Sequence, residues 1–252
     1  MILQVLPCMM LNFGLKYSRE ISLREIGPDG FARLRSASVT VIGLGATGSP
    51  AADLMVRAGV GSIKLVDGDT VDVTNLHRQI LYTQNDTGKN KAETAAKVLS
   101  AFNSDVTIRA VSENLNAQNA EEIIRGSSVV IDGTDNLNTR RIIDRVCYEL
   151  KIPWVFVASV GTMSQAKAII PDVTSCLHCF IPDSQGDGAS CEAMGVLASA
   201  PIMAASLGWT MALKIILGKE VTGDLFFIDP WNTEFQSVKI ARNPLCPVCG
   251  GH

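Results

Sequence analysis

The 252-residue sequence predicts an α/β protein with a doubly wound, mostly parallel sheet and a C-terminal appendage that carries paired cysteines. Short β-branched runs alternate with segments of helical periodicity, which is typical of parallel strands joined by crossover helices. Hydrophobic residues make up 47% of the chain and charged residues 19%, so a large buried core is expected. The alternation stops near Ala158, and two Cys-x-x-Cys pairs follow it.

The predicted elements alternate regularly through the first 158 residues. Strands are predicted at Val39–Ile42, Ile63–Val66, Val106–Val111, Val129–Ile131 and Trp154–Ala158. Helices are predicted at Pro50–Ala58, Lys91–Phe102, Ala117–Arg125 and Leu137–Leu150. Within Lys91–Phe102 the apolar residues fall on one helical stripe, as in a helix that packs on a sheet. These βαβ units predict helices on both faces of a Rossmann-like sheet.

The last third of the chain has a different pattern. We predict a strand at Ala166–Ile170, a polar crossover loop at residues 172–190, and an antiparallel strand pair at Leu225–Ile228 and Phe235–Ile240. We expect a single domain over residues 1–252, with an irregular N-terminal extension over residues 1–16 and a metal-binding tail over residues 243–252.

One uncharged stretch and the overall charge limit the possible partners. Ala193–Leu213 is long enough to span a bilayer, but its small residues and Pro201 favour a helix buried in the core or at a subunit interface. The first 15 residues lack the basic leader and cleavage site of a signal peptide. The net charge is −3, whereas general nucleic-acid binders usually carry a basic excess. We therefore expect a cytoplasmic protein that binds neither a membrane nor nucleic acid.

A glycine-rich loop follows the first predicted strand and opens a helix. Gly43 would make the tight turn, Gly45 would let a phosphate approach the backbone, and Gly48 would allow close packing of the helix on the strand. The helix N-terminus offers free N–H donors to an anion. The next strand ends at Asp67, where an acid would bind ribose hydroxyls. This combination predicts a nucleotide site, although glycine-rich loops are often simple turns.

The residues after Asp67 favour a triphosphate over a dinucleotide. Arg78 and Lys91 are two fixed cations near the predicted site, and a triphosphate offers them more negative charge than NAD does. Ligand contacts are expected from this segment, at Asp69, Thr74, Asn75, Leu76, His77, Arg78, Gln79 and Lys91. The alternatives are a solvated surface and an NAD-dependent oxidoreductase. No Gly-x-x-x-x-Gly-Lys-Ser/Thr sequence is present, so the site is not a P-loop.

Acidic and amide side chains follow the fourth predicted strand. Asp132, Asp135 and Asn136 come at the carboxyl edge of a parallel sheet, where carboxylates face the ligand crevice. Asp135 is placed to hold Mg²⁺, which proteins commonly bind through one or two carboxylates and the phosphates of a substrate. The alternative is that an Asp or Asn here only caps the helix Leu137–Leu150.

Two Cys-x-x-Cys pairs, Cys176/Cys179 and Cys246/Cys249, predict a zinc site. Two such pairs complete a closed tetrahedral Cys₄ site, which leaves no position for water and is therefore structural. The metal would join the crossover loop to the tail. Cys191 lies before the long apolar helix, where a thiol becomes more nucleophilic; a small buried residue is the alternative reading.

Together these motifs resemble the ThiF/MoeB/HesA adenylyltransferases, which are relatives of ubiquitin-activating enzymes. The resemblance runs from about Tyr17 to Gly250 and rests on the order and spacing of its motifs. These are Tyr17-Ser18-Arg19-Glu20, Gly43–Gly48, Asp67-x-Asp69, Asn75-Leu76-x-Arg78-Gln79, Lys91, Asp132-x-Thr134-Asp135-Asn136, Cys191-x-x-x-Gly195-Val196 and the cysteine pairs. The chain departs from the family pattern at Ala46-Thr47, where Gly-Leu is usual, at Glu20, where Gln is usual, and at Ser164, where Gly is common.

The resemblance implies ATP-dependent adenylylation of the C-terminal Gly-Gly carboxylate of a small ubiquitin-like sulfur carrier, of the ThiS or MoaD type, with release of pyrophosphate. It implies that Asp67 binds ribose, that the backbone at Ala46 approaches the nucleotide, and that Asp135 binds Mg²⁺. Phosphate contacts are implied for Asn75, Arg78 and Lys91.

The resemblance also concerns partners. Arg19 would reach across a homodimer interface into the ATP site of the second subunit, and in ThiF-like members Cys191 would form a covalent acyl link. No rhodanese domain follows the cysteine tail, so a separate protein would donate sulfur. A related alternative is the tRNA threonylcarbamoyladenosine dehydratase type, which the net charge and the paired cysteines disfavour.

Overall fold

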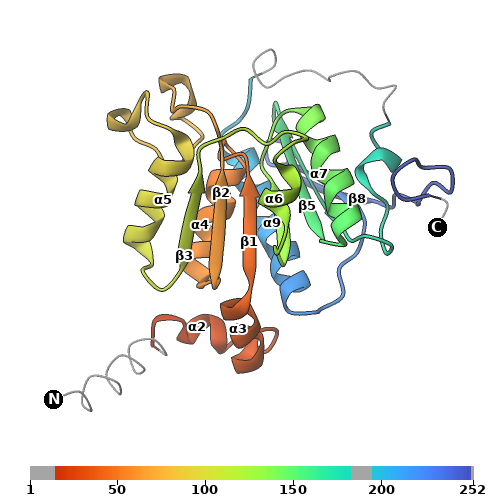
Figure 1. Ribbon diagram of the computed structural model, residues 1–252, viewed down its shortest axis with the longest axis horizontal. Helices are drawn as coiled ribbons and strands as arrows, with labels where there is room; N and C mark the ends of the chain where they lie inside the picture. The colour runs from red at the N-terminus through yellow and green to blue at the C-terminus, as the bar shows by residue number, and fades with distance from the viewer. Residues whose placement is uncertain (1–14, 183–194, 251–252) are drawn as a thin grey trace.

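The computed structural model describes residues 15–182 and 195–250, which form one eight-stranded sheet with helices on both faces (Figure 1). The strand order is β3-β2-β1-β4-β5-β6-β7-β8. The strands are β1 (Ser38–Ile42), β2 (Ser62–Val66), β3 (Thr107–Val111), β4 (Val129–Asp132), β5 (Trp154–Val160), β6 (Met163–Ile169), β7 (Leu225–Asp229) and β8 (Glu234–Val238). The predicted α/β class and doubly wound sheet are confirmed.

Strands β1 to β5 are parallel, and the direction in which the chain adds strands reverses between β1 and β4. Strand β1 pairs with β2 on one side and with β4 on the other, and β3 and β5 extend the two sides. The chain therefore winds outward from β1 in one direction and then returns to wind outward from β4 in the other. In open α/β sheets, ligands bind beyond the carboxyl ends of the strands at this switch point.

Strands β6, β7 and β8 are antiparallel and continue the same sheet. Strands β5 and β6 form a hairpin with seven residue pairs, β6 also pairs with β7, and β7 and β8 form the predicted antiparallel pair. The strand predicted from Ala166 begins earlier, at Met163. The C-terminal region is therefore an extension of the sheet, and the part that stands apart from it is the cysteine-bearing tail.

The helices surround this sheet. They are α2 (Ser18–Ile21), α3 (Gly27–Ser36), α4 (Gly48–Ala58), α5 (Lys91–Phe102), α6 (Ala120–Ile124), α7 (Leu137–Leu150) and α9 (Ser199–Ile216), with 3₁₀ turns η1 (Val73–Asn75), η2 (Gln84–Asp86) and η3 (Leu177–Cys179). Helices α5 and α7 have the predicted bounds because Asn90 and Asn136 cap their first turns. Helices α2 and α3 lie at the amino edge of the sheet, where β1 begins (Figure 1). Of the predicted N-terminal extension only Leu15 and Lys16 are described, and both are helical.

Helix α9 is apolar enough and long enough to cross a membrane by length and composition. It packs on the sheet, and its buried residues include Ala204, Ala205 and Ala212. Gly208 permits a close approach, because a Cβ there would lie 2.8 Å from a methyl carbon of Val157. The prediction of a helix buried against the core is confirmed.

Each face of the sheet has its own apolar core. One core lies under α4, α5 and α9 and includes Met55, Leu65 and Trp209. The other lies under α6 and α7 and includes Trp154 and Phe156, together with three of the four paired cysteines. The cysteine cluster is therefore part of a hydrophobic core rather than an exposed attachment.

Candidate functional site

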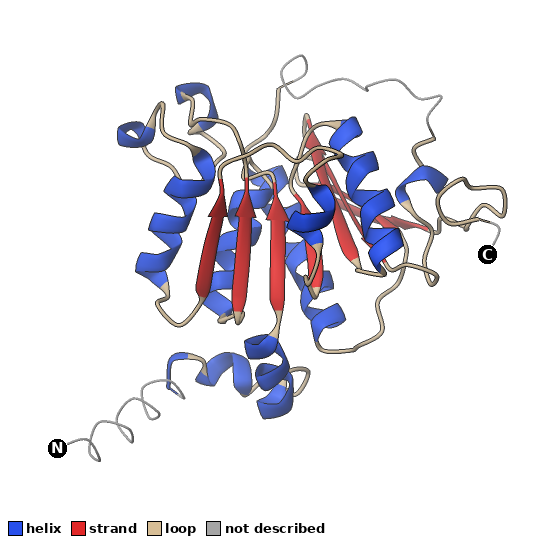
Figure 2. Ribbon diagram, in the orientation of Figure 1, coloured by secondary structure: helices blue, strands red, loops and turns tan. Residues whose placement is uncertain are grey.

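The loops that follow β1 and β4 touch one another at the switch point (Figure 2). A Cβ on Gly48 would lie 1.8 Å from the carbonyl oxygen of Gly43, and a Cβ on Gly133 would lie 2.5 Å from the same atom. Gly43 has a φ of +80°, in the left-handed region that favours glycine. The N–H of Gly133 donates to the carbonyl of Ile42 at 2.8 Å. These three glycines fix the shape of the loop from within the protein.

Gly45 has no such internal constraint. A Cβ there would have only one neighbour within 4 Å among the described residues, Nε2 of Gln79 at 3.7 Å. The backbone of Gly45 is also outside the left-handed region. Its missing side chain leaves space near the first turn of α4, whose N–H groups and dipole favour an anion. We call this space, at the carboxyl ends of the adjacent strands β1, β2 and β4, the crevice.

The two acids after β2 have different surroundings. Asp67 is 7% exposed; its Oδ2 accepts from the N–H of Leu44 at 2.7 Å and its Oδ1 accepts from the N–H of Asp69 at 2.9 Å. Burial raises the pKa of Asp67, and the nearby Lys91 acts in the opposite direction. The side chain of Asp69 is 61% exposed. Asp67 thus holds the glycine loop, while Asp69 is the more accessible acid.

Lys91 begins α5 and points toward these acids. Its side chain is 9% exposed, and its Nζ lies 3.3 Å from Oδ2 of Asp69. The hydroxyl of Tyr82 donates to the carbonyl of Leu44 at 3.0 Å and lies 3.5 Å from that of Lys91, so it joins the glycine loop to α5. Burial raises the pKa of Tyr82. Tyr82 was not predicted as a site residue, since a single tyrosine in a loop carries no local signal.

The segment 74–79 covers one side of the crevice. Arg78 is partly exposed, and its Nη1 donates to the carbonyl of Thr74 at 3.0 Å. Gln79 is 4% exposed and lies against Gly45, yet its Oε1 is buried without a hydrogen-bond donor among the described residues. Such an orphaned acceptor costs free energy, and a donor on a bound ligand or a water would remove this cost. The other predicted residues of this segment are Asn75 and Leu76, both partly exposed, and His77, which is exposed.

Asp132 is not placed for the ligand contact predicted for it. It is fully buried, accepts from the N–H of Thr134 at 2.9 Å, and pairs with Nε of Arg140 at 3.0 Å. The guanidinium of Arg140 lies 4.8 Å from the ring centroid of Phe156. Burial raises the pKa of Asp132, and Arg140 lowers it. The carboxylate of Asp132 therefore shapes the loop after β4 from inside.

Asp135 and Asn136 have different surroundings. Asn136 caps α7, since its side chain accepts from the N–H of Thr139 at 3.1 Å. Asp135 is exposed and follows the fully buried end of β4 by three residues. It therefore follows the carboxyl end of β4, and its role in binding Mg²⁺ stays a prediction.

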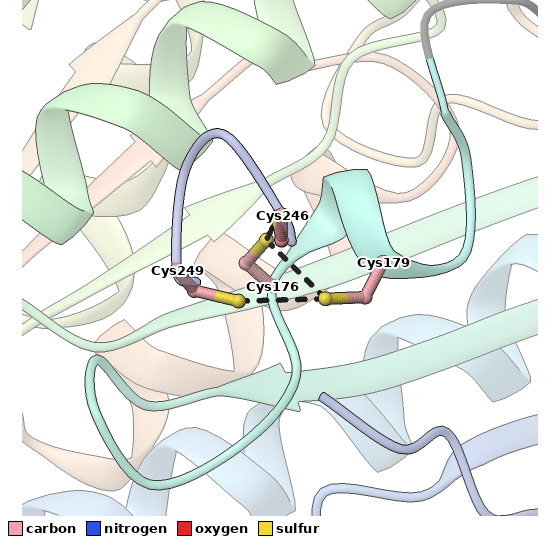
Figure 3. A group of neighbouring side chains, drawn as sticks. All are labelled: Cys176, Cys179, Cys246 and Cys249. Carbon is pink, nitrogen blue, oxygen red and sulfur yellow. Dashed lines mark hydrogen bonds between the residues drawn. The ribbon is translucent and has the colours of Figure 1, made fainter. Parts of the chain in front are cut away.

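The four paired cysteines come together as predicted, although two of them are 70 residues from the other two (Figure 3). The Sγ atoms of Cys176 and Cys246 are 3.4 Å apart, as are those of Cys179 and Cys249, and those of Cys176 and Cys179 are 3.8 Å apart. All four ligand atoms lie within 4.8 Å of one another. Burial raises the pKa of Cys179 to about 11 in the absence of a metal.

Hydrogen bonds to Asp144 and from Asn243 help to hold the cluster in place. Asp144 on α7 is 2% exposed, and its carboxylate accepts from the N–H groups of Leu177 at 3.1 Å and His178 at 3.4 Å. In the tail, the N–H of Asn243 donates to Sγ of Cys179 at 3.4 Å. Neither Asp144 nor Asn243 was predicted, because their roles depend on segments distant in the sequence.

One predicted residue lies away from the crevice, and another lies outside the described residues. Arg19 is exposed on α2, at the amino edge of the sheet, whereas the crevice lies at the carboxyl edge (Figure 1). It therefore cannot serve the crevice of its own chain in this arrangement. Cys191 lies within residues 183–194, outside the described residues.

Comparison with known proteins decides the family. The model of the ThiF family matches residues 17–248. The chain belongs to the ThiF family. Among relatives, it is 37% identical over 239 residues to the sulfur carrier protein ThiS adenylyltransferase of Bacillus subtilis, covering 93% of this chain and 71% of that protein. It is also 37% identical to the SAMP-activating enzyme E1 of Haloferax volcanii, over 93% and 88% of the two chains.

A third ThiF-family relative and a solved structure extend the comparison. The molybdopterin-synthase adenylyltransferase of Salmonella typhimurium is 33% identical, over 94% of this chain and 96% of that protein. The crystal structure of Escherichia coli MccB with ATP has a TM-score of 0.77 and 22% identity, covering 88% of this chain and 69% of that one. At this identity the structural likeness establishes the fold.

Proposed function

We propose that this ThiF-family chain adenylylates the C-terminal carboxylate of a small ubiquitin-like sulfur carrier that ends in Gly-Gly, using ATP. A carboxylate oxygen attacks the α-phosphorus of ATP, the bond from that phosphorus to the bridging oxygen breaks, and pyrophosphate leaves. The product is an acyl-adenylate. The observation that carries the proposal is the open space at Gly45 beside Gln79, at the carboxyl edge of the sheet, where the chain segments after β1, β2 and β4 also bear Arg78, Lys91 and Asp135.

The cations of the crevice answer the main electrostatic problem of this reaction. Two anions must approach each other, and negative charge accumulates on the leaving pyrophosphate. Lys91 is nearly buried, and its ion pair with Asp69 already holds the ammonium in position. Little movement of the lysine side chain is therefore needed when phosphate oxygens replace Asp69. Arg78 supplies a second cation, which its bond to Thr74 holds in place. Asn75 and Gln79 add amide groups for ribose or phosphate oxygens.

Asp135 is the residue that we assign to Mg²⁺. Its exposed carboxylate fits a cation that is shared with substrate phosphates. Asp132, the other acid of this loop, is already paired with Arg140. When bound, Mg²⁺ would neutralise phosphate charge. Asp67 would reach ribose hydroxyls with the lone pairs that its two backbone bonds leave free, as the backbone at Ala46 approaches the nucleotide.

The position of Arg19 supports a homodimer. Because α2 lies at the far edge of its own sheet, Arg19 can contribute to catalysis only in the crevice of a second copy of the chain. The acyl-adenylate would then form at two sites per dimer, each completed by the other subunit. We assign this activity to a soluble cytoplasmic protein that receives sulfur from a separate donor protein, with Cys191 as the residue for a covalent acyl link.

The cysteine cluster is assigned to a structural Zn²⁺. Four thiolates at about 2.3 Å from one tetrahedral ion would have their sulfurs about 3.8 Å apart. The three measured separations, 3.4, 3.4 and 3.8 Å, are close to this value. Zinc bound by Cys176, Cys179, Cys246 and Cys249 would join the loop after β6 to the tail.

The test is ATP–pyrophosphate exchange with a purified Gly-Gly-tailed carrier. Exchange should require the carrier and should fall about 100-fold or more in Asp135→Ala, a typical loss for an electrostatic contact to the transition state. The matched control is Glu149→Ala, which removes an exposed acid from the other end of α7 and should stay within about twofold of wild type. Exchange that needs no carrier, or that survives Asp135→Ala unchanged, would contradict the proposal. NADH binding without ATP binding would favour an oxidoreductase instead.

A further inference from the structure

A buried lysine lies beside the cysteine cluster and has no part in the proposed reaction. Lys167 on β6 is completely buried, and its neighbours Ala166 and Ala168 belong to the core under α9. Since side chains alternate along a strand, Lys167 points to the opposite face, together with Ile169, where the paired cysteines also lie. Lysine is almost never fully buried without a charged partner, so the position needs an explanation.

The near neighbours of the ammonium do not supply that partner. Among the described residues, Nζ of Lys167 makes a hydrogen bond to the carbonyl of Gly223 and no ion pair with a carboxylate. Nζ lies 5.8 Å from the ring centroid of Phe180, the residue that follows Cys179. One neutral carbonyl and one ring face satisfy part of the donor capacity and leave the ammonium without an ion pair among the described residues.

The cysteine cluster supplies the missing charge when it holds a metal. Four thiolates and one divalent cation carry two net negative charges, and Cys176, Cys246 and Cys249 are each at most 3% exposed. Burying that charge is costly unless N–H donors or cations compensate it. Asp144, which braces the cluster from α7, adds negative charge rather than removing it.

The electrostatics of the metal-free chain agree with this account. Burial lowers the pKa of Lys167 to about 8, while Asp224, Cys179, Cys176 and Asp144 act to raise it. Asp224 is only partly buried, so solvent screens it, whereas the sulfurs are enclosed in the same core as the lysine. The buried groups that act on the ammonium are thus the sulfurs of the cluster and the carboxylate of Asp144.

We propose that Lys167 is the internal counter-cation of the cysteine cluster and favours its metal-bound form. The inference rests on the proposed zinc site, and it assigns a role to a residue outside the four ligands. A neutral group at position 167 should leave the ligands in place and weaken their hold on the metal. Some neutral side chains at position 167 keep an N–H donor for the carbonyl of Gly223 and others do not. The effect of the charge can therefore be measured separately from the effect of this hydrogen bond.

The experiment measures zinc affinity by competition with a chromophoric chelator in the intact chain. Lys167→Met removes the charge and the donor, whereas Lys167→Gln removes only the charge and keeps an N–H for Gly223. Both should bind zinc at least about tenfold more weakly than wild type, because an attraction of this size is expected for enclosed charges of opposite sign. The matched control is Lys64→Met, another strand lysine whose Nζ donates to a backbone carbonyl, that of Ile123, remote from the cluster. Its zinc affinity should be unchanged.

Two outcomes with these variants would overturn the proposal. Wild-type zinc affinity in Lys167→Gln would show that charge has no role, even if Lys167→Met is weaker. An equal loss in Lys64→Met would show a general effect of destabilisation. If no neutral variant folds, the ¹³Cε resonance of Lys167 in the zinc-loaded wild-type chain decides, since an ammonium attracted by the cluster should stay protonated above pH 9. Wild-type protein that binds no zinc at all would instead remove the metal assignment, and leave the adenylylation test unaffected.

Discussion

The crevice and the cysteine cluster lie on one sheet, but different kinds of contact hold them. Backbone contacts of three glycines, and side chains such as Asp67 and Tyr82, fix the crevice within the parallel strands. The cluster joins two segments that are 70 residues apart and depends on sulfurs that point at a common centre. The crevice is therefore expected to be formed before its ligand binds, whereas the cluster is expected to need its metal.

The largest expected effect separates the glycines of the crevice from one another. Gly48→Ala should lower the free energy of unfolding by about 3 kcal/mol, because the new Cβ would lie 1.8 Å from the carbonyl oxygen of Gly43. Gly45→Ala should change it by less than about 0.5 kcal/mol and weaken ATP binding about tenfold, since its Cβ would occupy ligand space. Urea denaturation and calorimetric titration measure the two effects. Equal loss of stability in both variants would mean that Gly45 is also an internal packing residue.

A second prediction tests whether the nearly buried cation of the crevice acts on the reaction. Lys91→Met should reduce ATP–pyrophosphate exchange by about 100-fold while the chain stays folded. Lys89→Met is the control, because Lys89 is 57% exposed and pairs with Asp86. Its exchange rate should lie within about twofold of wild type. Similar losses of exchange in the two variants would mean that the loss comes from disturbing the start of α5 and not from removing the cation of Lys91.

Metal removal should affect only one of the two regions. A strong chelator should lower the melting temperature by about 5 °C and expose residues 243–250 to proteolysis, since free thiols replace metal bonds in the core. ATP affinity should change by less than about threefold, because the crevice is built from other contacts. Binding isotherms before and after chelation give the answer. Joint loss of ATP binding and of the tail would show that the two regions form one cooperative unit.

The smallest expected effect concerns pH and the turn before α5. Asp86 accepts from the N–H and hydroxyl of Thr83 and pairs with Lys89, and these bonds lower its pKa to about 2. A folded-state pKa below the unfolded value of about 3.8 stabilises the fold above pH 4 and loses that contribution as the pH falls toward 2. Asp86→Asn should therefore lower the melting temperature by about 2 °C at pH 7. The difference in melting temperature between Asp86→Asn and wild type should become smaller below pH 4. A difference that stays constant with pH would exclude the charge of Asp86 as its cause.

Local signals were sufficient for most of the parallel half of the fold. The helices Lys91–Phe102 and Leu137–Leu150 were predicted to the residue, since an Asn cap and an apolar stripe both act within a few residues. Helix Gly27–Ser36 was not predicted, although Pro28 in its first turn and the buried pair Phe31 and Leu34 are local signals for it. The pairing of β6 with β7 was out of reach, because strand pairing across distant segments leaves no trace in periodicity.

The same distinction holds for the site. The glycines, Lys91 and Asp135 belong to spaced motifs, so their neighbourhood could be predicted from the sequence. The burial of Asp132 could not, because it depends on Arg140 from the next helix. Tyr82 and Lys167 are single residues whose partners come from elsewhere in the fold. Sequence motifs thus locate a site, and three-dimensional packing decides which of their members reach a ligand.

The cysteine cluster also makes the last third of the chain a closed ring. With a metal bound, the path from Cys179 through α9, β7 and β8 to Cys246 begins and ends at the same ion. A single cut anywhere along that path would therefore leave two fragments that still migrate as one particle. Two links would join these fragments, the metal and the packing of their strands in the sheet. Removing the metal would break the first link and leave the second, so the metal would join the two fragments reversibly.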